Sequence, residues 1–527
     1  MQARATLQSF RRHPIQRWQT QIRWDHPDCY IRDMPSISPF VSPGEAKERT
    51  GDCIERLRWA SLWLWPIVVL GAVLRLVALG HKSFWLDEIA SVEIARLPHG
   101  AFWFQLWHHE GNMALYYVLL RPWLHLGGSE GSIRLLSAVV GIASIPLMYV
   151  LGRRLFGENT ARLATLFFAI NGCAIAVSQD ARGYSLLVLG VLASTYLFVR
   201  LIERPTLALA CAYAFVTGLT FYCHFFGMLV PAAQMVSLAA LPNEHRPWKQ
   251  LALAAPIIAL SAVPALWMIH VQDIGHIAWV KRPSGLELYH LGVYLAAGTG
   301  KAVGALLLLL DLALLILFLW TLKLLWRDRR HDPRCWRYVL IASCLFSPIF
   351  IALLVSIVRP IFYHRFLIVG LPAWVLMTAV GAEEIRSRTW RAAAIAGVCA
   401  LSLASAITSY SRVQEDWRGV TSYLIAQARP EDCVLYYQGF GYFAVESYRN
   451  WLPGGSAPRP QGVEVRPSND DWKKQINGAE RVWLVLYRAK LDDPVARAID
   501  ASLRDRYTLK QQVPFRAVTV LEYRAER

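Results

Sequence analysis

The stretch HKSFWLDEIASVEIARLPHGAFWFQLWHHEGNMALYY, residues 81–117, follows the first long apolar segment of the chain and is too polar to cross a membrane. It contains two adjacent carboxylates, Asp87 and Glu88, then Glu93, and a fourth, Glu110, preceded by two histidines. Carboxylates beside a bilayer are costly to desolvate, so their presence suggests a functional site. The alternative interpretation is a solvated loop whose aromatic side chains lie at the membrane interface.

The composition indicates a membrane protein that crosses the bilayer many times. Of the 527 residues, 55% are hydrophobic and 12% are aromatic. Apolar runs of roughly 18 to 25 residues recur, which is the length that crosses a ~30 Å hydrocarbon core. The net charge is +17, but Lys and Arg cluster in short loops between alternate apolar runs. This positive-inside pattern explains the charge without a nucleic acid partner, which we exclude.

Residues 1–58 are polar and contain many Arg and Pro residues. They lack the short apolar core of a cleavable signal peptide and predict a disordered cytoplasmic tail. Met34 is an alternative start. Because the basic tail stays in the cytoplasm, the first span should emerge on the external side.

One apolar stretch, residues 115–126, is short and contains an Arg and a Pro. The next run, 133–151, is followed by two Arg residues that should be cytoplasmic. Because the first span ends on the external side, the chain can cross the membrane only once between that span and these two Arg residues. We therefore expect 115–126 to lie in the outer leaflet, within one large external loop, residues 81–131. About eleven spans are then expected, at 61–80, 133–151, 161–178, 184–201, 206–222, 225–241, 251–269, 303–326, 338–358, 367–382 and 392–408.

The pattern changes after this helical region, which we assign to residues 59–409. Residues 410–527 predict a small α/β domain, placed outside by the parity of the spans. The expected helices are 417–428 and 494–506, the expected strands are 433–437, 482–487 and 517–523, and a Pro- and Gly-rich loop is expected at 456–468.

Several pieces of the chain, in this order, resemble the GT-C glycosyltransferases, specifically the bacterial relatives of protein O-mannosyltransferases and of lipid A aminoarabinose transferase. The pieces are WLDEIASVEIA, LYYVLLRPWLHLGG, SIRLLSAVVGIASIPLMYVLGRRLFG, SQDARGYSLLVL, FYCHFFGMLV, YHRFLIVGLPA and EDWRGV. The family commonly has two prolines before LYY, where this chain has Asn112, Met113 and Ala114. The predicted fold class is a polytopic α-helical membrane protein of GT-C type, with about eleven transmembrane helices, a large first external loop and a small C-terminal α/β domain.

The resemblance implies an enzyme that takes a sugar from a polyprenyl-phosphate donor on the external face of the cytoplasmic (inner) membrane. An acceptor hydroxyl displaces the lipid phosphate with inversion at the anomeric carbon. A carboxylate must accept the hydroxyl proton, and cations must stabilise the departing phosphate. The acceptor is left open as a lipid, a glycan or a protein.

Asp87 matches the catalytic carboxylate of the family and is the predicted general base. Adjacent residues on a helix do not share a face, so Glu88, the second member of the catalytic pair, is expected to orient or hold the helix. The alternative for Asp87 is that it only caps the helix or pairs with Lys82.

Glu110 and His224 match positions that hold a metal beside the donor phosphate in the aminoarabinose relative, and a divalent metal ion is expected there. Two ligands do not define a metal site, and a histidine at the end of a span is often a hydrogen-bonded interfacial residue. The nine Cys residues include no CxxC pair, which argues against structural zinc, iron–sulfur clusters and disulfides.

Arg182 is the main candidate for the donor phosphate, because a guanidinium binds phosphate oxygens bidentately. Its alternative role is to extend from a helix end towards the interface. The other donor-phosphate or substrate-binding candidates are Glu110, Asp180, Tyr184, His224, His364 and Arg365.

The rival interpretation from another class is a transporter or flippase of lipid-linked or small substrates, and a third is a non-catalytic scaffold. Against a transporter stand the absence of internal repeats and the scarcity of acidic residues within spans, apart from Asp311. Against a scaffold stand the carboxylates, which are sited as in a GT-C enzyme.

Overall fold

The computed structural model of the chain describes residues 63–272, 279–298, 301–327, 332, 334–411, 414–453, 460–465, 471–489 and 491–525. The predicted tail, residues 1–58, and the alternative start at Met34 lie outside these residues. The described elements belong to one compact unit, Trp63–Arg527.

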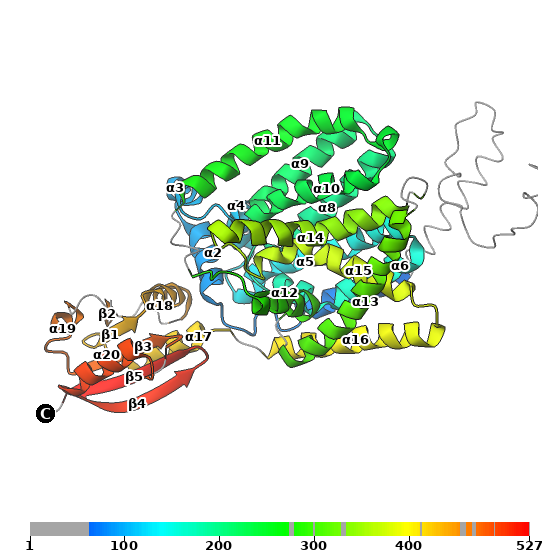
Figure 1. The fold of residues 1–527 in the computed structure, drawn as a ribbon. Helices are drawn as coiled ribbons and strands as arrows, with labels where there is room; N and C mark the ends of the chain where they lie inside the picture. The colour runs from blue at the N-terminus through cyan, green and yellow to red at the C-terminus, as the bar shows by residue number, and fades with distance from the viewer. Residues whose placement is uncertain are drawn as a thin grey trace, which may run out of the picture. The chain divides into compact units, whose positions relative to one another are not determined.

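Apolar helices make up most of the described chain (Figure 1). Within the described ranges, seven helices are long and apolar enough to cross a membrane, or eight if the pair α6 and α7, bent by 53°, is one span. The seven are α5 (Glu130–Phe156), α8 (Tyr184–Glu203), α11 (Trp248–Val271), α13 (Lys301–Arg327), α14 (Arg334–Val358), η6 with α15 (Phe366–Gly370 and Leu371–Glu383) and α16 (Arg388–Tyr410). The bent pair is α6 (Glu158–Ile170) and α7 (Gly172–Ser178).

Three shorter apolar helices lie at the positions of the other expected spans. They are Trp63–Leu76, α9 (Leu207–Cys223) and the run Phe225–Ala240, which is made of η2 (Phe225–Met228), α10 (Leu229–Ser237) and η3 (Leu238–Ala240). Every expected span therefore has helical structure at its position. The number of crossings, eleven, stays a prediction.

The segment between the first helix and α5 forms short helices. They are α2 (Leu86–Arg96), α3 (His99–His108), α4 (Ala114–Trp123) and η1 (Leu124–Leu126). The 10 residues of α4 rise about 15 Å, half of the ~30 Å hydrocarbon core. This length agrees with the prediction that residues 115–126 do not cross the membrane.

A helix that the sequence did not predict, α12 (Gly285–Ala297), packs against α7, α13 and α16. The Asn171 amide, at the break between α6 and α7, donates to the carbonyl oxygens of Leu295 and Ala296, both at 3.0 Å. A Cβ on Gly172 would lie 2.4 Å from the carbonyl oxygen of Ala297, so this close approach requires glycine. The helix has 13 residues and is too short to span, so hydropathy alone gives no signal for it.

A five-stranded sheet of order β2-β1-β3-β5-β4 follows α16. Strand β1 pairs in parallel with β2 and β3, whereas β5 is antiparallel to β3 and β4. The strands are β1 (Cys433–Tyr437), β2 (Gln461–Val465), β3 (Arg481–Tyr487), β4 (Tyr507–Phe515) and β5 (Val518–Ala525), and the helices are α17 (Trp417–Gln427), α18 (Phe440–Trp451), α19 (Asp471–Gln475) and α20 (Pro494–Arg504).

The two faces of the sheet belong to different apolar cores. Val434, Trp483 and Val485 pack in the same core as the long helices, together with α17 and α18. Leu435 and Leu484 face a second core with α19 and α20. Burial on both faces explains why β1 and β3 are nearly continuous apolar runs.

The expected helices and strands of this region are present, but the loop expected at 456–468 is a wrong prediction. It contains β2, which pairs in register with β1. The short sequence QGVEV has a weak strand signal and gains its order from this pairing. Helix α18 and strand β4 were also not predicted. The boundary of a separate domain at 410–527 stays a prediction.

Candidate active site

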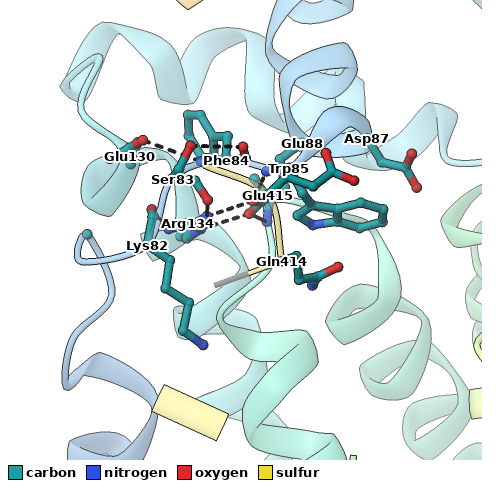
Figure 2. Close-up of polar contacts among 12 residues, drawn as sticks. Lys82, Ser83, Phe84, Trp85, Asp87, Glu88, Glu130, Arg134, Gln414 and Glu415 are labelled. Atoms are coloured by element: carbon teal, nitrogen blue, oxygen red, sulfur yellow. Dashed lines mark hydrogen bonds and ion pairs between the residues drawn. The ribbon is translucent and has the colours of Figure 1, made fainter. Parts of the chain in front are cut away.

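Glu88 ties the start of α2 to two distant elements. Its side chain is fully buried, and each carboxylate oxygen accepts two hydrogen bonds. Oε1 accepts from Arg134 Nε and the Ala181 amide, both at 2.7 Å. Oε2 accepts from Arg134 Nη2 at 2.6 Å and the Trp85 amide at 3.3 Å. Because α5 and the turn after α7 both hold this carboxylate, it fixes the orientation of α2 (Figure 2).

The Asp87 carboxylate points away from the Glu88–Arg134 pair (Figure 2). It is partly exposed and accepts no hydrogen bond from any described residue, although the Asp87 carbonyl accepts Ser91 Oγ at 2.9 Å. The alternative partner, Lys82, instead donates from Nζ to the Ser409 carbonyl at 2.7 Å. The carboxylate is therefore available to a substrate.

Arg182 lies where α2, α4 and the turn before α8 meet. Its Nη1 donates to the Asp87 carbonyl, Ser91 Oγ and Tyr117 OH, all at 3.2 Å. The side chain is 8% exposed, and the buried Nε has no partner in the described part of the chain. Burial disfavours the charge, but Tyr117 and Asp87 outweigh it and raise the pKa of Arg182. Three contacts to Nη1 thus aim the guanidinium, while its Nε–H remains without a partner among the described residues.

Glu110 reaches this cluster through a residue the sequence did not single out. Tyr117 OH donates to Glu110 Oε1 at 3.3 Å and accepts from Arg182. Tyr117 belongs to the LYY motif. A buried tyrosine hydroxyl usually has a hydrogen-bond partner, and this expectation could have identified Tyr117 as a site residue from the sequence.

His224 is buried beside Asn112, which is not the partner the sequence predicted. The Asn112 amide nitrogen lies 3.3 Å from His224 Nε2, and the Phe226 amide donates to His224 Nδ1 at 3.2 Å. The ring also packs against Tyr184, with centroids 5.8 Å apart. Burial and the nearby Arg182 lower the pKa of His224 to about 3, so the imidazole is neutral at pH 7.

The residues present do not fit a metal site as arranged. Among the described residues, no group of three His, Cys, Asp or Glu side chains could hold an ion. Both His224 nitrogens already face donors, and Glu110 contacts Tyr117. A divalent ion between Glu110 and His224 stays an untested prediction, and no step proposed below uses one.

Arg365 and His364 approach from the segment between α14 and η6. The Arg365 guanidinium lies over the Trp85 ring, 4.6 Å from its centroid, and Nη2 donates to Gln414 Oε1 at 3.2 Å. The His364 ring packs against Tyr294 with centroids 5.1 Å apart, and its buried Nδ1 has no partner among the residues described. Burial, then Arg365, lowers the pKa of His364 to about 4.

Asp180 adds a second unoccupied carboxylate. No described residue donates a hydrogen bond to it, and it interacts electrostatically with Glu88, Arg365, Arg134 and Lys82. Burial, followed by the neighbouring Glu88 carboxylate, raises the pKa of Asp180 to about 6. The structure thus brings residues of six motifs, separated along the chain, to one place.

Sequence comparisons match part of the chain. Residues 115–269 match the sequence model of the family described as dolichyl-phosphate-mannose-protein mannosyltransferase. YkcB, a candidate mannosyltransferase of Bacillus subtilis (strain 168), is 31% identical over 145 residues. The match covers 27% of this chain and 20% of YkcB, so the chain spans about one fifth of that relative.

Solved structures match nearly the whole chain. ArnT from Cupriavidus metallidurans in the apo state has a TM-score of 0.59 and 13% identity, covering 88% of this chain and 98% of that one. The same protein bound to undecaprenyl phosphate has a TM-score of 0.56 and 14% identity, covering 87% of this chain and 98% of that one. A third match is the archaeal oligosaccharyltransferase AglB from Archaeoglobus fulgidus, in complex with an inhibitory peptide and a dolichol-phosphate. Its TM-score is 0.51 and its identity 12%, and the match covers 81% of this chain and 69% of that one. The resemblance to GT-C glycosyltransferases is confirmed, and at these identities the structures show the fold alone.

Proposed function

We propose that this chain, which has the GT-C fold, is an inverting glycosyltransferase that moves a sugar from a polyprenyl-phosphate donor to an acceptor hydroxyl. We place the reaction on the external face of the cytoplasmic membrane, with the N-terminus cytoplasmic. The observation that carries the proposal is Asp87, whose carboxylate accepts no hydrogen bond from the described residues while its backbone carbonyl accepts one from the guanidinium of Arg182. The undecaprenyl phosphate bound by ArnT supports this donor class.

Asp87 acts as the general base. It accepts the proton of the acceptor hydroxyl as that oxygen forms a bond to the anomeric carbon. The bond from the anomeric carbon to the phosphate oxygen breaks, and its electron pair leaves with polyprenyl phosphate. Attack opposite the departing phosphate inverts the anomeric configuration.

Arg182 and Arg365 supply the positive charge for the phosphate. The lowered pKa values of His224 and His364 leave both imidazoles neutral at pH 7, so neither adds charge there. Negative charge grows on the phosphate as the sugar leaves, and fixed cations in a partly dry site stabilise that change strongly.

Glu88 is a positioning residue in this mechanism. Two hydrogen bonds on each oxygen occupy its lone pairs, so it is poorly placed to accept a proton from a substrate. Asp180 and Tyr184 remain candidates for contacts to the sugar. We assign Asp180 that role because its carboxylate is unoccupied beside Arg365.

The test is transfer by the purified protein in lipid, with a panel of radiolabelled polyprenyl-phosphate hexoses and pentoses. Sugar should appear on an acceptor and free polyprenyl phosphate should accumulate in equal amount. Chelator added to the same reaction tests the predicted metal. Movement of intact donor across vesicles with no release of polyprenyl phosphate would instead support the flippase.

A further inference from the structure

Glu415, the first residue of the EDWRGV motif, gathers four hydrogen bonds at the start of α2. It is 1% exposed. Oε2 accepts from the Leu86 amide at 2.9 Å and from Trp417 Nε1 at 2.8 Å. Oε1 accepts from Tyr487 OH and Arg488 Nη2, both at 2.7 Å. One carboxylate therefore joins α2 to α17 and to the end of β3.

The contact with Leu86 gives a hydrogen-bond partner to a backbone amide that has none within the helix. Leu86 is the first residue of α2, and amides of the first turn have no partner inside a helix. The preceding residue, Trp85, makes no side-chain cap. A carboxylate at this end is also favoured by the helix dipole. Glu88 accepts the Trp85 amide, whereas Glu415 caps the next amide, that of Leu86, and the residue after Leu86 is Asp87.

The segment before α2 is bound to the same region by a second cluster (Figure 2). Tyr448, on α18, accepts the Phe84 amide at 2.6 Å and donates to Glu130. Arg418, on α17, pairs with Glu130 at 2.5 Å and donates from its amide to Ser83 Oγ at 3.0 Å. The segment that leads into α2 is therefore held by α17 and α18, which cover one face of the sheet.

Arg488 extends from the carboxyl end of β3. It has a φ of +50°, unusual for a residue with a side chain, and its amide donates to the Ala517 carbonyl at 2.8 Å. The side chain is 60% exposed although its Nη2 is bound to Glu415. Burial disfavours its charge, but Tyr487, Glu415 and Asp87 outweigh it and raise the pKa of Arg488. Arg488 therefore lies within electrostatic reach of Asp87.

We propose that Glu415 is a positioning residue for Asp87, so that the C-terminal sheet completes the active site. This inference rests on the proposed function, because it takes Asp87 as the general base. Among the described residues, the hydrogen bond from Glu415 to α2 is made at its first residue, so loss of the cap should displace the base without removing any group that touches the donor.

The test compares Glu415→Gln with a matched control, Asp432→Asn. Glutamine keeps the shape of Glu415 but replaces one carboxylate oxygen by an NH₂ donor, and three of the four groups around it, the Leu86 amide, Trp417 Nε1 and Arg488, can only donate. Asp432 is 4% exposed and also accepts four hydrogen bonds or ion-pair contacts, from Arg429, Arg481 and Trp483, yet none from residues 81–96. Both variants lose a buried carboxylate that accepts hydrogen bonds from β3, and Glu415→Gln alone alters the cap of α2.

A second variant, Leu86→Pro, removes the capped N–H and leaves Glu415 in place. Proline is well tolerated at the first helical position, and Trp85, with φ −90° and ψ 168°, has the extended conformation that a following proline requires. It keeps the inference testable if Glu415→Gln does not fold.

We expect Glu415→Gln and Leu86→Pro to lower kcat about tenfold to a hundredfold with an unchanged KM for the donor, since small misplacement of a catalytic group has this effect. Asp432→Asn should keep its kcat. Hydrogen exchange at residues 83–91 should be faster in Glu415→Gln than in the parent or in Asp432→Asn. A folded Glu415→Gln with parental kcat, or an equal loss in Asp432→Asn, would overturn the inference. If the parent transfers no sugar, the proposed function fails. Separately, hydrogen exchange at residues 83–91 that is the same in Glu415→Gln as in the parent would refute the role of Glu415 as the cap.

Discussion

The carboxylates of Asp87 and Glu88 are neighbours in sequence but face different surroundings. Glu88 is fully buried and binds Arg134 at 2.6 and 2.7 Å, whereas Asp87 is partly exposed and without a hydrogen bond to any residue of the described ranges. Successive residues on a helix are about 100° apart, so a firm hold on one carboxylate directs the other elsewhere. This division of roles gives distinct expectations for the two substitutions.

Asp87→Asn should abolish transfer while donor binding stays intact. A positioned base contributes about 10² to 10⁴ in rate. Glu93→Gln is the control, because Glu93 lies on the same helix and its carboxylate pairs with Arg96, at 3.8 Å, and with no other residue that the structure describes. Initial rates and donor binding measured on both variants give the answer. Retention of more than about a tenth of the activity by Asp87→Asn would refute Asp87 as the base.

The main effect of Glu88→Gln should be a loss of stability of the folded protein. Removing one partner of a buried ion pair leaves the other charge uncompensated and costs ~3–5 kcal/mol. Thermal unfolding in detergent should show a large fall in Tm, unlike Asp87→Asn, which should unfold near the parental Tm. Parental stability in Glu88→Gln would contradict the positioning role.

Arg182→Ala should weaken donor binding and slow transfer. A charge-assisted contact is worth ~1.5–3 kcal/mol, about ten- to a hundredfold in affinity. Affinity for the acceptor should scarcely change. Tyr117→Phe, which removes one of the three acceptors of Nη1, is a milder variant and should show a smaller loss. Parental donor affinity in Arg182→Ala would place the phosphate elsewhere.

Transfer should decline as the pH falls through about 6. Burial and then Glu88 raise the pKa of Asp180 to about 6, so below that pH the carboxyl is mostly neutral. If its anion contacts the sugar, kcat/KM falls with acidification in the parent. Asp180→Asn should be slower and should lose this decline between pH 5 and 7. The same decline in Asp180→Asn would assign it to another group.

The proposed topology places the external loop and the sheet on the same side of the membrane. Single cysteines at Ser129 and Asn477, both exposed, should react with an impermeant thiol reagent added outside. Cysteine at Asn243, expected on the cytoplasmic side, should react only after permeabilisation. The exposed Cys211 is replaced by Ser in all three. Protection of the Ser129 site would overturn the assignment of residues 115–126.

Hydropathy was enough to locate the apolar helices, because each of them is a local pattern. It failed for α12, whose order depends on Asn171 and on the close approach at Gly172. It failed for β2, which gains its hydrogen bonds from β1. These elements are stabilised by partners far along the chain, which no local window contains.

The candidate site likewise has a part that the sequence predicts and a part that depends on contacts between distant residues. Motifs identified Asp87 and Arg182, but the sequence could not show that Arg182 binds a carbonyl 95 residues away. Glu415 lies in a motif, but the motif predicts no role for it, because its partner Leu86 is 329 residues earlier. The same holds for Tyr117 and Arg134, while Asn112 stands out in the sequence only as a departure from the family pattern. Residue type suggests chemistry, while the pairing of distant side chains requires the fold.

The bond between Leu86 and Glu415 also has a consequence for synthesis. The ribosome completes Leu86 329 residues before its cap. At ~5–20 residues per second, this delay is roughly 16 to 66 seconds. Throughout that interval the helices enter the membrane while the first turn of α2 waits for its partner. Helix α2 is therefore among the first parts made and among the last to acquire its final support.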